Sequence, residues 1–156
     1  MIDGPDWVQR PARMGDVRQI VEIINDHASK GRMLPRSLNQ VYEGLREYEV
    51  AEADGQIVGC GALSITWEDL CEIRSVAVRE QWQNKGVGTR IVKALLDHAR
   101  KLGARRVFLL TYQPGFFERF GFGETEKDGL PHKVWSDCIN CVKFPDCDEI
   151  AMMLRI

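Results

Sequence analysis

The residue pattern best suited to chemistry is a glycine turn between a predicted strand and a predicted helix. The turn reads Gln83-x-x-Gly86-x-Gly88, and Lys85 and Arg90 add positive charge beside it. A helix start leaves backbone amides without helical partners and carries partial positive charge. Glycine lets an anion approach the backbone closely, because it has no Cβ. The turn is therefore predicted to bind a phosphate or pyrophosphate group.

Two well-known phosphate motifs do not fit this turn. The dinucleotide fingerprint Gly-x-Gly-x-x-Gly needs a third glycine that is missing here, and the Walker pattern Gly-x-x-x-x-Gly-Lys-Ser/Thr is also absent. A tight turn without any ligand is the alternative, because glycine turns are common. The glycines alone therefore do not identify a phosphate site. The position of the turn between a strand and a helix is the stronger indication of one.

A carboxylate and an arginine are predicted to share one face of the preceding strand. Glu72 and Arg74 are two residues apart, so their side chains should point to the same side of a sheet. A carboxylate can accept a proton from an amine, and an arginine offers a planar fork to a substrate carboxylate. The alternatives are an exposed carboxylate at Glu72 and a salt bridge from Arg74 to Glu72 or Asp69.

The hydrophobic spacing predicts strands and helices in mixed order around this stretch. Strands are expected over 7–13, 48–53, 56–67, 73–78, 106–111 and 150–154, and helices over 17–28, 37–45, 86–102 and 114–120. Asp54-Gly55 predicts a tight hairpin, Asp16 and Ser37 are predicted helix N-caps, and Gly103 is a predicted helix stop. The order predicts one α/β domain over 1–156, with a mixed central sheet of about six to seven strands flanked by helices.

Composition narrows the class of protein further. The 156 residues carry a net charge of −2 and 44% hydrophobic residues, which is typical of a globular domain. This balance predicts no attraction to nucleic acid or to an anionic membrane. No apolar run approaches the roughly 20 residues that span a bilayer, and Met1 to Arg10 lacks the apolar core of a signal peptide. We therefore expect a cytoplasmic protein with reduced cysteines.

One cluster of residues has the types that ligate metals. It consists of His132, Cys138, Cys141 and Cys147. Cys-x2-Cys is a normal half of a zinc site. The other spacings do not form a second knuckle, and free buried cysteines are common. We therefore expect no metal, with a structural zinc ion as the alternative.

The glycine turn resembles motif A of the GNAT acetyltransferase superfamily, whose signature is Gln/Arg-x-x-Gly-x-Gly/Ala between the fourth strand and the third helix. The resemblance implies the GNAT fold and acetyl-CoA as cosubstrate. It also implies that the turn's amides hold the pyrophosphate and that the preceding strand pairs its backbone with the pantetheine arm. The residues implied are Val76, Ala77, Val78, Gln83, Asn84, Lys85, Gly86, Val87, Gly88 and Thr89.

The run from Phe116 to Phe122 resembles the family's motif B, with one departure. Phe117 stands where many members have a tyrosine that protonates the leaving thiolate. Thr111 matches a serine position proposed as the acid in longer enzymes, and the adjacent Tyr112 has a more suitable ordinary pKa of about 10. We rank these two candidates for the acid nearly equal.

A closer resemblance covers nearly the whole chain. The chain looks like the short N-acetylglutamate synthases, which are GNAT domains without the amino-acid-kinase domain of the longer enzymes. The segments that carry this resemblance are Asn25–Ala28, Leu34–Leu38, Val58–Leu63, Trp67–Leu70, Glu72–Ser75 and Leu130–Trp135. The resemblance implies transfer of an acetyl group from acetyl-CoA to the α-amino group of L-glutamate, the first step of arginine biosynthesis.

Several alternatives stay open beside this reaction. The acceptor can be L-glutamine or another small amino acid, or a protein N-terminus or lysine. A non-enzymatic module that senses acetyl-CoA or arginine is a further option. The oligomeric state also stays open, with a homodimer as one option.

The resemblance also implies roles for individual side chains. A glutamate that matches Glu72 looks like the catalytic base of the longer synthases, and Arg74 is expected to bind a substrate carboxylate. Arg36 lies in the loop that covers the acceptor site in this superfamily. Lys133 and Lys143 lie in the C-terminal segment that also lines this site. A dicarboxylate acceptor needs such cations.

Overall fold

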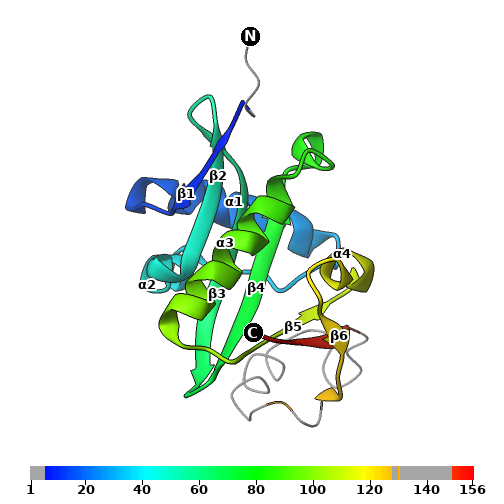
Figure 1. The fold of residues 1–156 in the computed structure, drawn as a ribbon. Coiled ribbons are helices and arrows are strands. Elements are labelled where there is room, and N and C mark those ends of the chain that lie inside the picture. Colours follow the sequence, from blue (N-terminus) through cyan, green and yellow to red (C-terminus); the bar gives the residue numbers. More distant parts are fainter. Residues whose placement is uncertain (1–5, 128–129, 131–148) are drawn as a thin grey trace. The chain divides into compact units, whose positions relative to one another are not determined.

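The computed structural model describes residues 6–127, 130 and 149–156 of the chain. Within this part, seven strands form a mixed sheet in the order β1-β2-β3-β4-β5-β7-β6 (Figure 1). Their bounds are β1 Val8–Pro11, β2 Tyr48–Ala53, β3 Gln56–Trp67, β4 Leu70–Val78, β5 Arg106–Thr111, β6 Gly123–Glu124 and β7 Ile150–Arg155. The predicted α/β fold with a mixed sheet is confirmed.

Among the described residues, four α-helices and three short 3-10 helices connect these strands. The α-helices are α1 Val17–Ser29, α2 Leu38–Glu43, α3 Val87–Leu102 and α4 Pro114–Glu118. The 3-10 helices are η1 Met14–Asp16, η2 Leu45–Glu47 and η3 Glu80–Trp82. In the part of the chain that the structure describes, no helix combines the length and the apolar character needed to cross a membrane.

The chain forms two compact units. The first consists of Met1–Leu63 with Ser75–Asp97, and the second of Ser64–Arg74 with His98–Ile156. Strands β3 and β4 and helix α3 each contribute residues to both units.

The first unit is built on the hairpin of β2 and β3. Ala53 pairs with Gln56, and the two turn residues Asp54 and Gly55 have φ of +50° and +79°. Positive φ at both central residues suits the right-handed twist of a two-residue hairpin. The structure confirms the predicted hairpin, including both strand bounds.

Helix α1 covers one face of this hairpin with an apolar stripe. Val17, Ile20, Ile23 and Ile24 are buried and pack in one cluster with β3 residues that include Cys60. Full burial of one such side chain contributes roughly 1.5–3 kcal/mol to folding. The stripe therefore anchors α1 and the loop that follows it to the sheet.

The two predicted caps have different outcomes. Ser37 caps α2, because its Oγ accepts from Gln40 N at 3.1 Å while Gln40 Oε1 accepts from Ser37 N at 2.8 Å. Asp16 occupies the N-cap position of α1, but its side chain makes no cap bond there. Its carboxylate instead accepts from the Arg10 guanidinium and from Arg13 N. The prediction that Asp16 caps α1 through its side chain is therefore wrong, because an arginine on β1 competes for the carboxylate.

Helix α3 lies against the opposite face of β3 (Figure 1). A Cβ added at Gly59 would lie 2.7 Å from Val87 Cγ1, and one added at Gly61 would lie 2.8 Å from Ile91 Cγ2. Real Cβ atoms essentially never approach this closely. These two glycines therefore let the start of α3 pack directly on the strand.

The second unit is built around β5. Leu70 to Glu72 of β4 pair in parallel with Arg106 to Phe108 of β5, and β7 pairs with β5 in antiparallel along its length. Three predicted bounds are corrected here, because β4 begins at Leu70 instead of residue 73, α4 ends at Glu118 instead of residue 120, and β7 continues to Arg155. Strand β6, which pairs with β7, was not predicted, since two residues carry no readable alternation.

Candidate active site

The turn between β4 and α3 has the backbone geometry that an anion site requires. Asn84 and Gly86 have left-handed backbone angles, with φ of +63° and +86°. The hydrogen bond from Arg90 N to Gly86 O, over 3.0 Å, begins the helical pattern of α3, and a helix start directs its first amides outward along the helix axis. A Cβ built on Gly86 would meet no atom within 4 Å. The turn thus fits a pyrophosphate that approaches along the helix axis.

Two cations beside this turn rest on aromatic rings. Lys85 Nζ lies 5.3 Å from the centre of the Trp82 ring, and the Arg90 guanidinium lies 5.9 Å from the centre of the Trp7 ring. A cation over a ring face is held electrostatically. Both cations remain exposed. Their charge therefore adds to the helix dipole at the place where an anion would bind.

Strand β4 bends before it reaches the turn. Ser75 has φ of +58°, which is uncommon for a residue with a side chain. Burial raises the pKa of the Cys60 thiol to about 12, so this thiol stays protonated and donates to Ser75 O at 3.4 Å. Arg79 N donates to Val58 O of β3 at 2.8 Å. Arg79 N and Val78 O belong to the same peptide group and point in opposite directions. Because Arg79 N points to β3, the carbonyl of Val78 points away from β3, and so does the Val78 amide.

The carbonyl of Val78 joins three segments of the first unit. It accepts from Nε2 of His27 on α1 at 2.9 Å and from Nε2 of Gln83 at 3.2 Å. A carbonyl oxygen has two lone pairs, and these two bonds use both. Gln83 is the first residue of the predicted motif. Its side chain therefore closes the turn onto the end of β4.

The loop after α1 is held by the side-chain amide of Asn25. Asn25 Nδ2 donates to Arg36 O, and Arg36 N donates to Asn25 Oδ1, both at 3.0 Å. This pair of bonds fixes the backbone of Arg36, whose side chain is half-buried. Asn25 thus positions the arginine that was predicted near the acceptor site.

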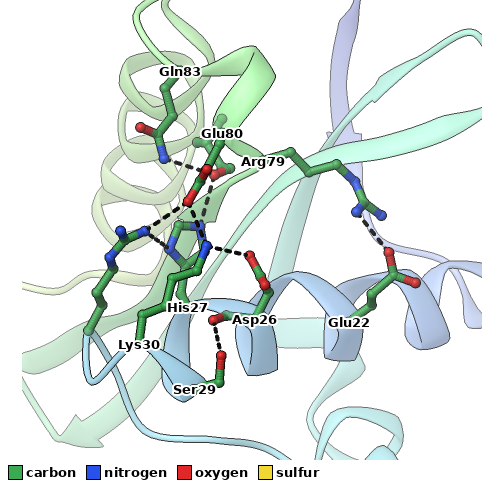
Figure 2. A network of polar contacts seen from close by, with 10 residues as sticks. Glu22, Asp26, His27, Ser29, Lys30, Arg79, Glu80 and Gln83 are labelled. Carbon is green, nitrogen blue, oxygen red and sulfur yellow. Dashed lines mark hydrogen bonds and ion pairs between the residues drawn. The ribbon is translucent and has the colours of Figure 1, made fainter.

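A polar cavity of about 370 Å³ lies between α1 and η3. Figure 2 shows Lys30 reaching both Asp26 and Glu80, at 3.4 and 2.6 Å, while Arg79 pairs with Glu22 at 2.8 Å. The Lys30 ammonium holds the pKa of Glu80 below its ordinary value. The cavity is lined by Glu22, Ile23, Asp26, His27, Lys30, Arg79, Glu80 and Gln81. Its cations are thus each matched by an acid.

In the second unit, Glu72 and Arg74 are neighbours on one face of β4, as predicted. Glu72 Oε1 lies 3.9 Å from Arg74 Nη1, and the two side chains are 16% and 27% exposed. Asp69, the other partner considered for Arg74, forms an ion pair with Arg106 at 3.2 Å. The structure therefore places a carboxylate and a guanidinium side by side, and both side chains are mostly buried.

The two candidates for the acid lie at the end of β5. Thr111 is buried, and its Oγ1 accepts from Gln113 N at 2.8 Å, just before α4 begins. Tyr112 is half-buried. Phe117, in the place of the family's tyrosine, is buried against Phe116 and Phe122 with ring centres 4.9 and 5.9 Å away. Phe117 has only a packing role there.

Some predicted residues lie outside the described part of the chain. These are Lys133 and Lys143, together with His132, Cys138, Cys141 and Cys147. Within residues 6–127, 130 and 149–156, no group of three or more His, Cys, Asp or Glu side chains could hold a metal ion.

The sequence prediction assigned no role to His27, Glu80 or Asn25. The spacing of Ile20, Ile23 and Ile24 continues to residue 27, where a histidine occupies an apolar position. A histidine in such a stripe is the one signal that could have indicated a buried polar contact. Its partner in β4 is far away in sequence, so the contact itself was not predictable.

The comparison with protein families gives a match over most of the chain. The model described as "Acetyltransferase (GNAT) family" matches residues 20–122. These residues run from α1 to Phe122, which follows α4. They include the turn with the anion-site geometry.

The chain is similar to three proteins whose descriptions mention an amino-acid acetyltransferase, CoA or N-acetyl-glutamate. An amino-acid acetyltransferase of Mycobacterium tuberculosis is 44% identical over 83% of this chain and 76% of that protein. A structure from Mycobacterium tuberculosis in complex with CoA and NLQ is 36% identical, with a TM-score of 0.81 over 96% of this chain and 99% of that chain.

The third relative is the N-acetylglutamate synthase of Neisseria gonorrhoeae, complexed with coenzyme A and N-acetyl-glutamate. It is 28% identical, and its TM-score is 0.87 over 98% of this chain. The present chain spans 36% of that synthase. The likeness therefore concerns one part of a longer enzyme.

Proposed function

The chain belongs to the acetyltransferase (GNAT) family and is an acetyl-CoA-dependent N-acetyltransferase, and we infer its reaction from this membership. Acetyl-CoA supplies an acetyl group that is activated as a thioester. Residues 83–89 would hold its pyrophosphate, because they offer helix-start amides and an open approach at Gly86. The backbone of Val76, Ala77 and Val78 would hold the pantetheine arm.

We propose that the acceptor is the α-amino group of a free amino acid, with L-glutamate first and L-glutamine second. The observation that carries this proposal is the 44% identity to an enzyme named amino-acid acetyltransferase. The synthase complex with N-acetyl-glutamate supports glutamate as the first choice. The reaction would then be the first step of arginine biosynthesis.

Glu72 would act as the base. The α-amino group of a free amino acid is mostly protonated near neutral pH, so it must lose a proton before it attacks the thioester. Arg74, whose guanidinium lies 3.9 Å from Glu72, would bind a substrate carboxylate on the same face of β4. Glu72 would then accept a proton from the amino group of the substrate, while Arg74 would bind a carboxylate of the same molecule.

A dicarboxylate acceptor needs a second cation. Arg36 is the candidate among the described residues, because Asn25 fixes its backbone and its side chain is half-buried. Lys133 and Lys143 remain further candidates from the sequence. A planar guanidinium can take a carboxylate through two hydrogen bonds, which favours Arg36.

Thr111 or Tyr112 would protonate the leaving thiolate. The Thr111 hydroxyl accepts from Gln113 N, so its own proton stays available for donation. Tyr112 has the advantage of an ordinary pKa of about 10, closer to that of a thiol. Phe117 has no proton to give, so one of these two residues would replace the family's tyrosine.

The proposal is tested by following thiol release from acetyl-CoA with a panel of acceptors. The panel contains glutamate, glutamine, aspartate, arginine, leucine and short peptides with free N-termini or lysines. We expect glutamate or glutamine to give the highest kcat/KM. Turnover with peptides and none with free amino acids would contradict the proposal and favour a protein acetyltransferase.

A further inference from the structure

His27 occupies an apolar position of α1 but makes polar contacts. It continues the stripe of Ile20, Ile23 and Ile24, and it is 7% exposed. A buried imidazole costs free energy unless its nitrogens are hydrogen-bonded. Its two partners therefore explain how a histidine is tolerated at this position.

The two hydrogen bonds of His27 are satisfied by a single neutral form of the ring. Nε2 lies 2.9 Å from Val78 O, and a carbonyl can only accept, so Nε2 carries the proton. Nδ1 lies 3.2 Å from Arg32 Nη1, and a guanidinium can only donate, so Nδ1 accepts. The ring thus bridges a donor on the loop after α1 and an acceptor at the end of β4.

Both hydrogen-bond partners of His27, Val78 and Arg32, belong to segments that carry candidate site residues. Val78 is the last residue of β4. Its carbonyl also accepts a hydrogen bond from Nε2 of Gln83, the first residue of the pyrophosphate turn. Arg32 lies in the loop that continues to Arg36. The carbonyl of His27 also accepts from Arg32 N at 3.1 Å, so ring and backbone hold the same loop. His27 therefore connects the loop to the strand that leads into the turn.

Other contacts between these segments are exposed. Lys30 and Arg32 pair with Glu80 at 2.6 and 3.5 Å, as Figure 2 shows for Lys30, and all three side chains are well exposed. Exposed ion pairs contribute about 0–1 kcal/mol each and weaken in salt. The buried bonds of His27 are therefore better placed to fix the geometry.

We propose that His27 is a positioning residue for the acetyl-transfer reaction. It acts through Val78 to fix the entrance of the pyrophosphate turn and through Arg32 to fix the loop that carries Arg36. It touches neither substrate. The part that concerns Arg36 rests on the proposed function, whereas the part that concerns the turn rests on acetyl-CoA binding alone.

The test compares His27→Leu with His27→Gln. Leucine fills the space without hydrogen bonds, whereas a glutamine amide offers one donor and one acceptor that can replace both bonds. For His27→Leu we expect the Kd for CoA, measured by calorimetry without an acceptor, to rise about tenfold, and the KM for acetyl-CoA to rise with it. We expect kcat to fall less, and His27→Gln to restore most of the affinity.

A matched control is His98→Leu, which removes an imidazole near the C-terminal end of α3. It should leave the Kd for CoA unchanged. His27→Asn serves as a second loss variant if His27→Leu fails to fold, because its shorter side chain cannot reach both partners. A normal Kd for CoA in the folded loss variant, with only a lower Tm, would overturn the proposal. Failure to acetylate any amino acid would instead contradict the proposed function.

Discussion

Glu72 Oε1 and Arg74 Nη1 lie 3.9 Å apart on one face of β4, with both side chains mostly shielded from water. This spacing suits a base beside a carboxylate-binding arginine, and it also suits an ion pair that only stabilises the fold. The two accounts differ in what each substitution changes. Kinetics and thermal unfolding on the same variants therefore separate them.

Glu72→Gln keeps the shape of the side chain and removes the base. We expect kcat to fall by about 10²–10⁴, with a modest change in the acceptor's KM. The loss should shrink at high pH, because more of the acceptor amine is then already neutral. Steady-state rates measured across pH check this. A normal kcat with a lowered Tm would end the catalytic role of Glu72.

Arg74→Lys keeps the charge and removes the planar fork. We expect the acceptor's KM to rise roughly 10- to 100-fold, because a charge-assisted hydrogen bond worth about 1.5–3 kcal/mol is lost. The Kd for CoA should stay unchanged. If the KM is also unchanged, Arg74 serves only the ion pair with Glu72.

Gly86→Val should weaken acetyl-CoA binding strongly. The φ of +86° at this position strains any β-branched residue, and the side chain would project where the pyrophosphate is expected. Gly86→Asn is the matched control for strain, since asparagine tolerates positive φ better. Calorimetry with CoA measures the effect. Wild-type affinity in a folded Gly86→Val protein would exclude this turn as the pyrophosphate site.

Gly59→Ala should destabilise the protein by about 1–3 kcal/mol, because the added Cβ meets Val87 at 2.7 Å and Ile91 at 3.2 Å. Gly15→Ala is the control, since a Cβ there meets no atom within 4 Å. Urea unfolding of both variants measures the difference. Equal stability of the two would show that α3 does not depend on close contact with β3.

Asp16 should contribute stability that depends on pH. Burial would raise the pKa of this carboxyl, but hydrogen bonds from Arg10 and from Arg13 N outweigh burial and hold the pKa below its ordinary value. A lowered folded-state pKa stabilises above the unfolded value of about 3.9, and this stability is lost as pH falls through the folded pKa. Asp16→Asn should therefore lower the urea midpoint at pH 7. This difference should shrink below about pH 4.

Local signals in the sequence were sufficient for most of the fold. Asp54-Gly55 fixed the hairpin because positive φ at both residues is a local requirement. Ser37 capped its helix as predicted, since its partner Gln40 lies three residues away. Asp16 failed as a side-chain cap because Arg10, on another element, binds its carboxylate. Local chemistry could not indicate that competition.

The candidate site was predictable only where its parts are close in sequence. The turn at Gly86 and the pair Glu72 and Arg74 follow from short-range spacing. The junction at Val78 O does not, because His27 reaches it from α1 across 51 residues. The pairing of Asn25 with the backbone of Arg36 is likewise a contact that only folding creates.

The central claim is that this acetyltransferase acts on the α-amino group of free glutamate. The direct measurement is identification of the product by NMR and mass spectrometry after incubation with acetyl-CoA and glutamate. We predict α-N-acetylglutamate in an amount equal to the CoA thiol released, and about 10²–10⁴ times less of it with Glu72→Gln at neutral pH over the same time. Thiol release without N-acetylglutamate, or acetylation confined to peptides in the same mixture, would contradict the account.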